Sequence, residues 1–205
     1  MDILKILFDL DGTLVDTQKT HAEVESSLMA EHGITLNQVD LTSRFAGIPT
    51  YRVFMDALGC GEEVARELEV RKWDILLPRF QEAVPLADLT VLFSGLLDRG
   101  ISLAIGTASP RVWAWNILNR HRLLEFFDEG AIVGGDMVEN GKPAPDIWIK
   151  AAGSVPCEKC LVIEDGAAGV QGAISVGMRA GLLLPKQYEG AISLDRLGDI
   201  LQLLD

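Results

Sequence analysis

This chain alternates between continuous apolar runs and stretches in which apolar residues recur at helical spacing. The runs are short and nearly unbroken, which is typical of strands buried on both faces of a parallel sheet. They predict strands at residues 3–10, 101–107, 130–133, 160–164 and 180–184. The stretches between them predict helices at residues 91–98, 112–121, 144–152 and 169–176. This regular strand–helix order predicts an α/β fold, a Rossmann-like parallel sheet with helices on both faces.

One long segment interrupts the strand–helix order directly after the first strand. Residues 17–81 contain helical spacing at 22–32, 51–58 and 62–77 but no convincing strand pattern. We therefore expect two domains. Residues 1–16 and 82–205 would form the α/β core, and residues 17–81 a small α-helical cap inserted into it.

Composition and charge narrow the possible partners. The chain has 205 residues, of which 48% are hydrophobic, and its net charge is −12. A surface this acidic repels nucleic acid and anionic membranes, and no apolar run reaches the roughly 20 residues of a membrane span. Three cysteines indicate no disulfide framework, so we expect a cytoplasmic protein, monomeric or homodimeric, without a signal peptide.

Acidic residues follow the first predicted strand. Asp9 and Asp11 are two positions apart, so side-chain alternation would point them the same way. Like charges this close repel unless a cation or a proton lies between them. Gly12 permits a turn before Thr13, which places both acids at the carboxyl edge of the sheet, where ligands bind. A divalent metal and a reacting group at this edge would explain the pair.

Polar residues also follow the second strand and precede a later helix. Thr107 and Ser109 offer hydroxyls for an anion together with backbone N–H groups, although Ser109 before Pro110 is equally suited to cap a helix. Lys142 lies in the sequence Gly-Lys-Pro-Ala-Pro, just before a helix, where the helix dipole disfavours a cation. A lysine placed there is expected to neutralise an anion.

The fourth predicted strand ends in another acidic pair, Glu164 and Asp165. With Asp9 and Asp11 they offer a set of oxygen ligands that suits Mg²⁺, a cation that shares its coordination shell with water and substrate phosphate. Asp165 is the stronger candidate for direct contact, whereas Glu164 could act through a metal-bound water.

In this order, Asp9-Leu10-Asp11-Gly12-Thr13, Thr107, Lys142 and Glu164-Asp165 resemble the motifs of the haloacid dehalogenase superfamily of phosphohydrolases. The resemblance spans nearly the whole chain. It implies a Rossmann-like core with a helical cap and hydrolysis through an aspartyl-phosphate. Asp9 would be the nucleophile and a metal ligand. Asp11 would be the general acid, then the base, and would lend its carbonyl to the metal. Thr107 and Lys142 would hold the phosphoryl group.

Within the superfamily, the chain is similar to the branch of phosphoglycolate phosphatases, sugar-phosphate phosphatases and β-phosphoglucomutases. The resemblance implies a small phosphorylated substrate, such as phosphoglycolate or a sugar phosphate. Further substrate contacts would come from Gly12, Thr13, Ala108 and Ser109 in the core, and from His21, Gly47 and Lys72 in the cap.

Two alternatives stay open. Mutases of this branch have an arginine where this chain has Thr50 and a lysine where it has Pro110. Because a mutase must hold a second phosphate, the loss of both cations favours a phosphatase over a mutase. A non-catalytic binding or regulatory relative is the remote alternative, and the presence of both Asp9 and Asp11 disfavours it. Trp113, Trp115 and Trp148 are interpreted as packing residues.

Overall fold

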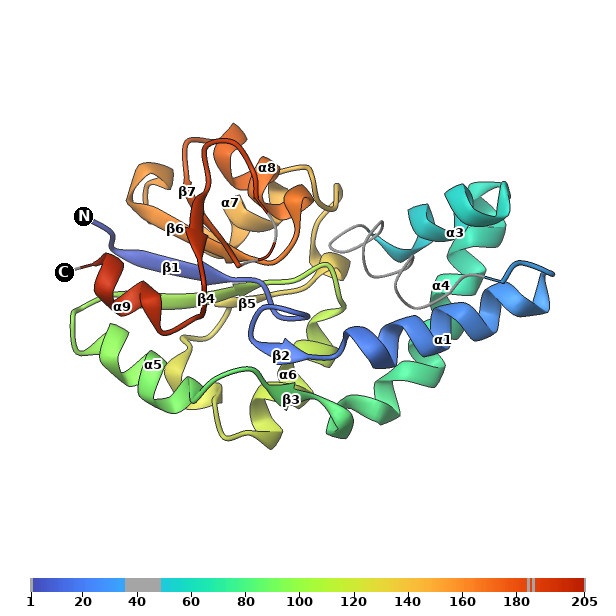
Figure 1. The fold of residues 1–205 in the computed structure, drawn as a ribbon, viewed down its shortest axis with the longest axis horizontal. Helices are drawn as coiled ribbons and strands as arrows, with labels where there is room; N and C mark the ends of the chain where they lie inside the picture. Colours follow the sequence, from blue (N-terminus) through green and yellow to red (C-terminus); the bar gives the residue numbers. More distant parts are fainter. Residues whose placement is uncertain (1, 36–48, 184, 186, 205) are drawn as a thin grey trace.

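A computed structural model describes residues 2–35, 49–183, 185 and 187–204. Its centre is a six-stranded sheet in the order β5-β4-β1-β6-β7-β8, with every neighbouring pair parallel (Figure 1). The strands are β1 (Lys5–Phe8), β4 (Ser102–Gly106), β5 (Ile132–Val133), β6 (Cys160–Glu164), β7 (Arg179–Leu183) and β8 (Ile192–Leu194). The α/β Rossmann-like fold is confirmed. β8 was not predicted.

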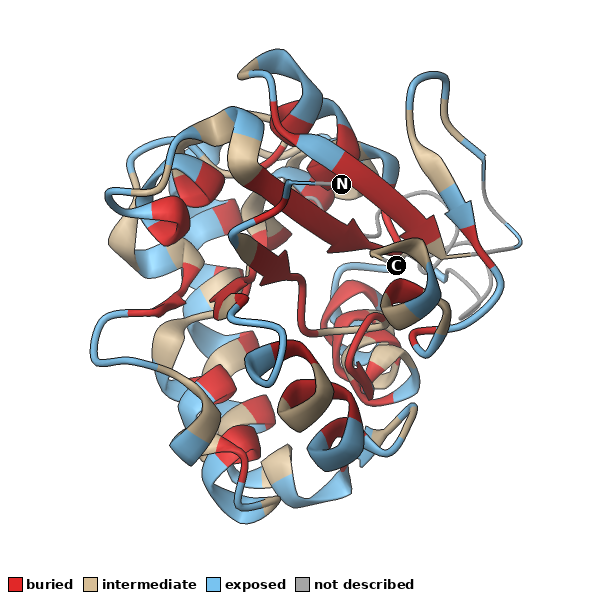
Figure 2. Cartoon of the chain, turned by 90° about the vertical axis from the view of Figure 1, so that its left-hand side faces the viewer, coloured by how far each residue is buried: buried red, intermediate tan, exposed pale blue. Residues whose placement is uncertain are grey.

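Helices cover both faces of this sheet because the strands are apolar on both faces. In β1, Ile6 and Phe8 pack into one hydrophobic cluster, and Leu7 packs into the other. The first cluster includes residues of α5 (Leu89–Leu97), α6 (Arg111–Arg120) and α9 (Asp199–Leu203). The second includes residues of α7 (Asp146–Ala152) and α8 (Ala167–Ser175), on the opposite side of the sheet in Figure 1. Figure 2 shows the buried strands between helices whose outer surfaces are exposed.

Three helices pack against one another beyond the carboxyl edge of the sheet: α1 (Gln18–Glu31), α3 (Thr50–Leu58) and α4 (Glu62–Leu76) (Figure 1). They agree with the helices predicted within residues 17–81. The chain enters and leaves this region through an antiparallel pair that was not predicted, β2 (Val15–Asp16) and β3 (Val84–Pro85). The division into a core domain and a cap domain stays a prediction. The β2–β3 pair lies next to the two positions at which the chain would pass from one domain to the other.

Short 3-10 helices complete the fold at residues Leu77–Glu82, Leu124–Phe126, Gly135–Met137 and Cys157–Lys159. Within the described ranges, no helix combines the length and apolar character needed to cross a lipid bilayer.

Candidate active site

The carboxyl ends of three neighbouring strands bring the candidate residues together. β1 lies between β4 and β6, and Phe8 is in register with Ile105 and Ile163. Asp9 follows Phe8 directly, and its backbone N–H donates to the carbonyl of Ile163 at 2.9 Å. The residues that follow β4 and β6 therefore lie at the same edge as Asp9, as predicted for a parallel sheet.

Lys142 is the centre of a buried charged cluster at this edge. Its ammonium donates to Asp9 Oδ1 at 2.6 Å and to Glu164 Oε1 at 2.7 Å, and Nζ lies 4.4 Å from the Trp148 ring centroid. Burial raises the pKa of Asp9 to about 7 and also raises that of Glu164, while the Lys142 charge opposes both shifts. Burial works against the charge of Lys142, but the two carboxylates outweigh it and raise the pKa of its ammonium. Lys142 therefore stays a cation among acids.

The carboxylates of Asp9, Glu164 and Asp165 place oxygen atoms within 4.8 Å of one another. An all-oxygen set of this kind fits Mg²⁺. Glu164 is already fully engaged, because Oε1 accepts from Lys142 and Oε2 accepts from the backbone N–H groups of Asp165 and Gly166 at 3.0 and 2.8 Å. This geometry favours Asp9 and Asp165 as direct ligands, and gives Glu164 the task of holding Lys142 and the turn after β6.

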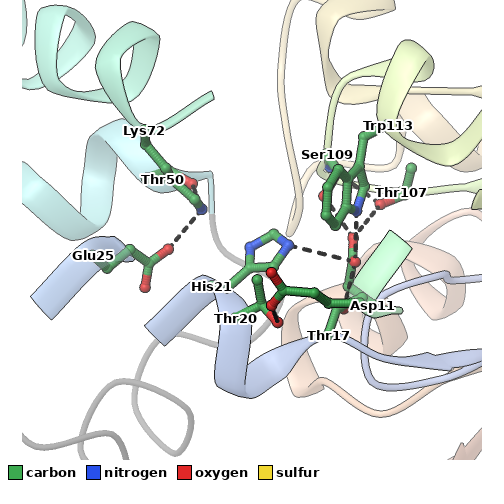
Figure 3. A network of polar contacts seen from close by, with 11 residues as sticks. Asp11, Thr17, Thr20, His21, Glu25, Thr50, Lys72, Thr107, Ser109 and Trp113 are labelled. Carbon is green, nitrogen blue, oxygen red and sulfur yellow. Dashed lines mark hydrogen bonds and ion pairs between the residues drawn. The ribbon is translucent and has the colours of Figure 1, made fainter. Parts of the chain in front are cut away.

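Asp11 accepts from a second group of side chains, several of which are drawn in Figure 3. The two carboxylates have different hydrogen-bond partners, and strand alternation does not fix the direction of Asp11, because β1 ends at Phe8. The oxygens of Asp11 accept hydrogen bonds from four side chains: Thr17 at 2.6 Å, Ser109 at 2.6 Å, Trp113 Nε1 at 2.9 Å and Thr107 at 3.3 Å.

Charge around Asp11 keeps this carboxylate ionised. Burial works against its charge, but the interaction with His21, whose Nε2 lies 3.5 Å from Oδ1, and the hydrogen bonds from Ser109 and Thr17 outweigh burial. Together they hold the pKa of Asp11 well below its usual range. A role as general acid would first require this carboxylate to take up a proton.

The loop after Asp11 passes very close to Asp165. Gly12 has φ +88°, and a Cβ atom there would lie 2.7 Å from Asp165 Oδ2, so glycine is required on both counts. The next residue, Thr13, has a buried hydroxyl without a hydrogen-bond partner within the described part of the chain. An unsatisfied buried hydroxyl beside the acids is consistent with an absent ligand.

A cavity of about 460 Å³ opens from Lys142 toward the inserted helices. On the core side it is lined by Ala108, by Pro110 and by seven residues between 135 and 147. On the side of the inserted helices it is lined by residues of α3 and α4, including Tyr51 and Trp73. The charged cluster therefore adjoins a space in which a small molecule fits.

A family model described as haloacid dehalogenase-like hydrolase matches residues 6–182, which include every strand-end residue above. The chain belongs to this family. Fructose-1-phosphate phosphatase YqaB of Escherichia coli (strain K12) is 30% identical over 185 residues, covering 85% of this chain and 93% of that protein. The phosphorylated carbohydrates phosphatase of Thermotoga maritima is 30% identical over 188 residues, covering 84% and 81%. Since these relatives are phosphatases, this haloacid dehalogenase-like hydrolase is a phosphoric monoester hydrolase.

Among solved structures, β-phosphoglucomutase from Clostridium difficile matches with a TM-score of 0.83 at 23% identity, covering 97% of this chain and 93% of that one. At this identity the likeness shows a common fold.

Three residues of this haloacid dehalogenase-like hydrolase were expected to contact substrate from the cap. His21 lies beside Asp11. Lys72 is instead 2% exposed and donates to Glu25 at 2.6 Å and to Thr50 at 2.7 Å, so its charge is neutralised among three helices (Figure 3). Gly47 lies outside the described residues. The assignment of all three to substrate binding stays a prediction.

Besides Thr17, two more residues that donate hydrogen bonds to the acids of the site were not predicted from the sequence. Trp113, interpreted as packing, donates its indole N–H to Asp11, and its ring lies edge-on to His21 at 5.5 Å. Gln18 donates to Asp165 Oδ2 at 2.8 Å. Neither belongs to a strand-end motif. Nothing in the sequence marks Gln18 as a site residue except its position shortly after the first motif, at the start of α1.

Proposed function

We propose that this protein is a Mg²⁺-dependent phosphatase that hydrolyses a small phosphorylated metabolite through an aspartyl-phosphate on Asp9. One observation carries the proposal. The buried Lys142 ammonium binds Asp9 while Glu164 holds it from the other side, and a cavity of small-molecule size begins at this lysine. A cation fixed beside a nucleophilic carboxylate suits attack on phosphate, where two anions must meet.

The residues divide the reaction between them. An oxygen of Asp9 attacks phosphorus as the bond to the leaving oxygen breaks. Asp11, which is ionised in the free protein, takes up a proton when the substrate binds and gives it to that oxygen. In the second step Asp11 takes a proton from the water that attacks the phosphorus and frees Asp9. Lys142, Thr107 and the N–H groups after β1 hold the phosphoryl oxygens.

Mg²⁺, held by Asp9, Asp165 and the Asp11 carbonyl, would screen the repulsion between carboxylate and phosphate. The residues present fit this cation, because the donor set is made of oxygen atoms and Asp9 and Asp165 lie close together.

Phosphoryl transfer between two positions of a sugar is the second candidate, and the shared fold with β-phosphoglucomutase motivates it. The cavity weakens it, because Pro110 lines the wall where those mutases place a lysine. Thr50 stands in place of the second cation and accepts from Lys72. The curated relatives, which act on fructose 1-phosphate and on phosphorylated carbohydrates, favour hydrolysis of a sugar or polyol monophosphate.

The test is phosphate release from p-nitrophenyl phosphate and from a panel of sugar and polyol monophosphates. We expect activity that disappears after exhaustive chelation and returns with Mg²⁺. Full activity after chelation would contradict the metal assignment. A parallel incubation with β-glucose 1-phosphate and a bisphosphate primer tests the mutase. Glucose 6-phosphate forming faster than free phosphate would overturn the phosphatase.

A further inference from the structure

The cavity that begins at Lys142 is lined by more acids than bases. Among its described lining residues, α4 contributes Glu69 and Asp74, and the segment after β5 contributes Asp136 and Glu139. Within the described part of the chain, the cations in this lining are Lys142 and Arg66. The acids come from both the inserted helices and the core, so acidic residues line this space from two parts of the chain.

Both of these cations already have acidic partners in the protein. Lys142 is fully buried and bound to Asp9 and Glu164. The Arg66 guanidinium pairs with Glu62 at 2.6 Å and lies 4.2 Å from the Tyr51 ring centroid.

The acids differ in how far the protein already uses them. Glu69 accepts from the backbone N–H of Tyr51 at 3.2 Å, and Asp136 accepts from that of Arg111 at 2.8 Å, so both also support the backbone. For Asp74 and Glu139, no hydrogen bond or ion pair with another described residue is found, and both are exposed.

Carboxylates without protein partners accept hydrogen bonds from hydroxyl groups and repel anions. Trp73, Val70 and Val138 line the same space and offer apolar surface to the carbon skeleton of a polyol. The lining therefore suits a leaving group that is neutral and carries hydroxyls.

We propose that this cavity selects phosphate monoesters with a neutral, hydroxylated leaving group over esters that carry a second anionic group, and that Asp74 and Glu139 determine this selectivity. The proposal rests on the phosphatase function above and narrows its substrate class. We therefore expect higher kcat/KM values for sugar and polyol monophosphates than for phosphoglycolate and bisphosphates.

The experiment compares two esters of equal length, 2-hydroxyethyl phosphate and 2-phosphoglycolate, which differ by a hydroxymethyl group in place of a carboxylate. Their kcat/KM values are measured with Mg²⁺, and each ester is also tested as a competitor of p-nitrophenyl phosphate hydrolysis. We expect the wild-type protein to prefer 2-hydroxyethyl phosphate by about tenfold or more, and the preference to shrink as salt is added.

The variants assign the preference to residues. Each of Asp74→Asn and Glu139→Gln should reduce the ratio of the two kcat/KM values by about two- to fivefold, and the double variant by roughly the product. Glu67→Gln is the matched control, since Glu67 is an exposed acid of the same helix α4 that does not line the cavity. It should leave the ratio unchanged.

Four outcomes would overturn the proposal. A wild-type ratio at or below one, with p-nitrophenyl phosphate turned over, would contradict the selectivity while leaving the phosphatase intact. The selectivity would also be contradicted if neither ester competes with p-nitrophenyl phosphate, or if the double variant keeps the wild-type ratio of kcat/KM values. Absence of Mg²⁺-dependent turnover of every ester, p-nitrophenyl phosphate included, would reject the phosphatase and this inference with it.

Discussion

Replacing Lys142 with methionine would leave two buried carboxylates without their cation. Nζ lies 2.6 Å from Asp9 Oδ1 and 2.7 Å from Glu164 Oε1, and the side chains of Lys142 and Glu164 expose no surface. Removing one partner of a buried ion pair typically costs about 3–5 kcal/mol. Since whole domains are stable by about 5–15 kcal/mol, we expect Lys142→Met to lose a large part of the free energy of unfolding.

The loss should grow with pH. Burial raises the pKa of Asp9 and Glu164 above their unfolded values. Without the lysine, the largest opposing effect is lost, and the backbone N–H of Gly166 still opposes the shift at Glu164. A carboxyl group with a raised folded pKa is neutral in both states at low pH, and as pH rises it ionises first in the unfolded chain. Stability therefore falls with rising pH. The difference between wild type and Lys142→Met should be larger at pH 7.5 than at pH 5.

The assay is urea unfolding followed by circular dichroism at both pH values, with EDTA present so that no divalent cation replaces the ammonium. Lys19→Met is the control, because Lys19 is 77% exposed and lies 3.8 Å from Glu23. It should change stability little. A loss below about 1 kcal/mol in Lys142→Met, equal at both pH values, would refute the reasoning.

Two further substitutions test assignments made from single contacts. Trp113→Phe removes the indole donor to Asp11 and should lower kcat by about tenfold with little change in KM, since a hydrogen bond to a charged group contributes about 1.5–3 kcal/mol. The matched control is Trp115→Phe, since Trp115 is on the exposed side of α6. Equal kcat values for the two variants would show that the hydrogen bond from Trp113 does not position Asp11 for catalysis. Lys72→Met should destabilise the fold, and adding Glu25→Leu should restore most of the loss, because replacing both partners of a buried pair is often neutral. A stable double variant with a greatly raised KM would instead make Lys72 a substrate ligand.

The sheet was predictable because its strands are buried on both faces. Leu7 packs on one side of β1 while Ile6 and Phe8 pack on the other, and such a strand has to be a continuous apolar run. β2 and β3 are two residues long, and β8 is a three-residue strand at the edge of the sheet. These segments are too short to carry a periodic signal, so their pairing was not predictable.

The candidate site was predictable where charge had to be compensated. Asp9, Lys142 and Asp165 stood out because acids and a lysine at strand ends are costly without a ligand or a partner. The direction of Asp11 was not predictable, because it depends on where β1 stops, and one residue changes the side to which a side chain points. The contact of Trp113 with Asp11 was not predictable, because a buried tryptophan counts as apolar in the sequence pattern whether or not its N–H donates to an acid.

The measurement that tests the central claim most directly is steady-state turnover of p-nitrophenyl phosphate by the wild type and by Asp9→Asn, both saturated with Mg²⁺. The amide cannot attack phosphorus, so we predict turnover in the wild type and none above background in the variant. Circular dichroism and the unfolding midpoint would show that the variant is folded. Substantial phosphatase activity in pure, folded Asp9→Asn protein would contradict the aspartyl-phosphate route and the role given to the Lys142 cluster.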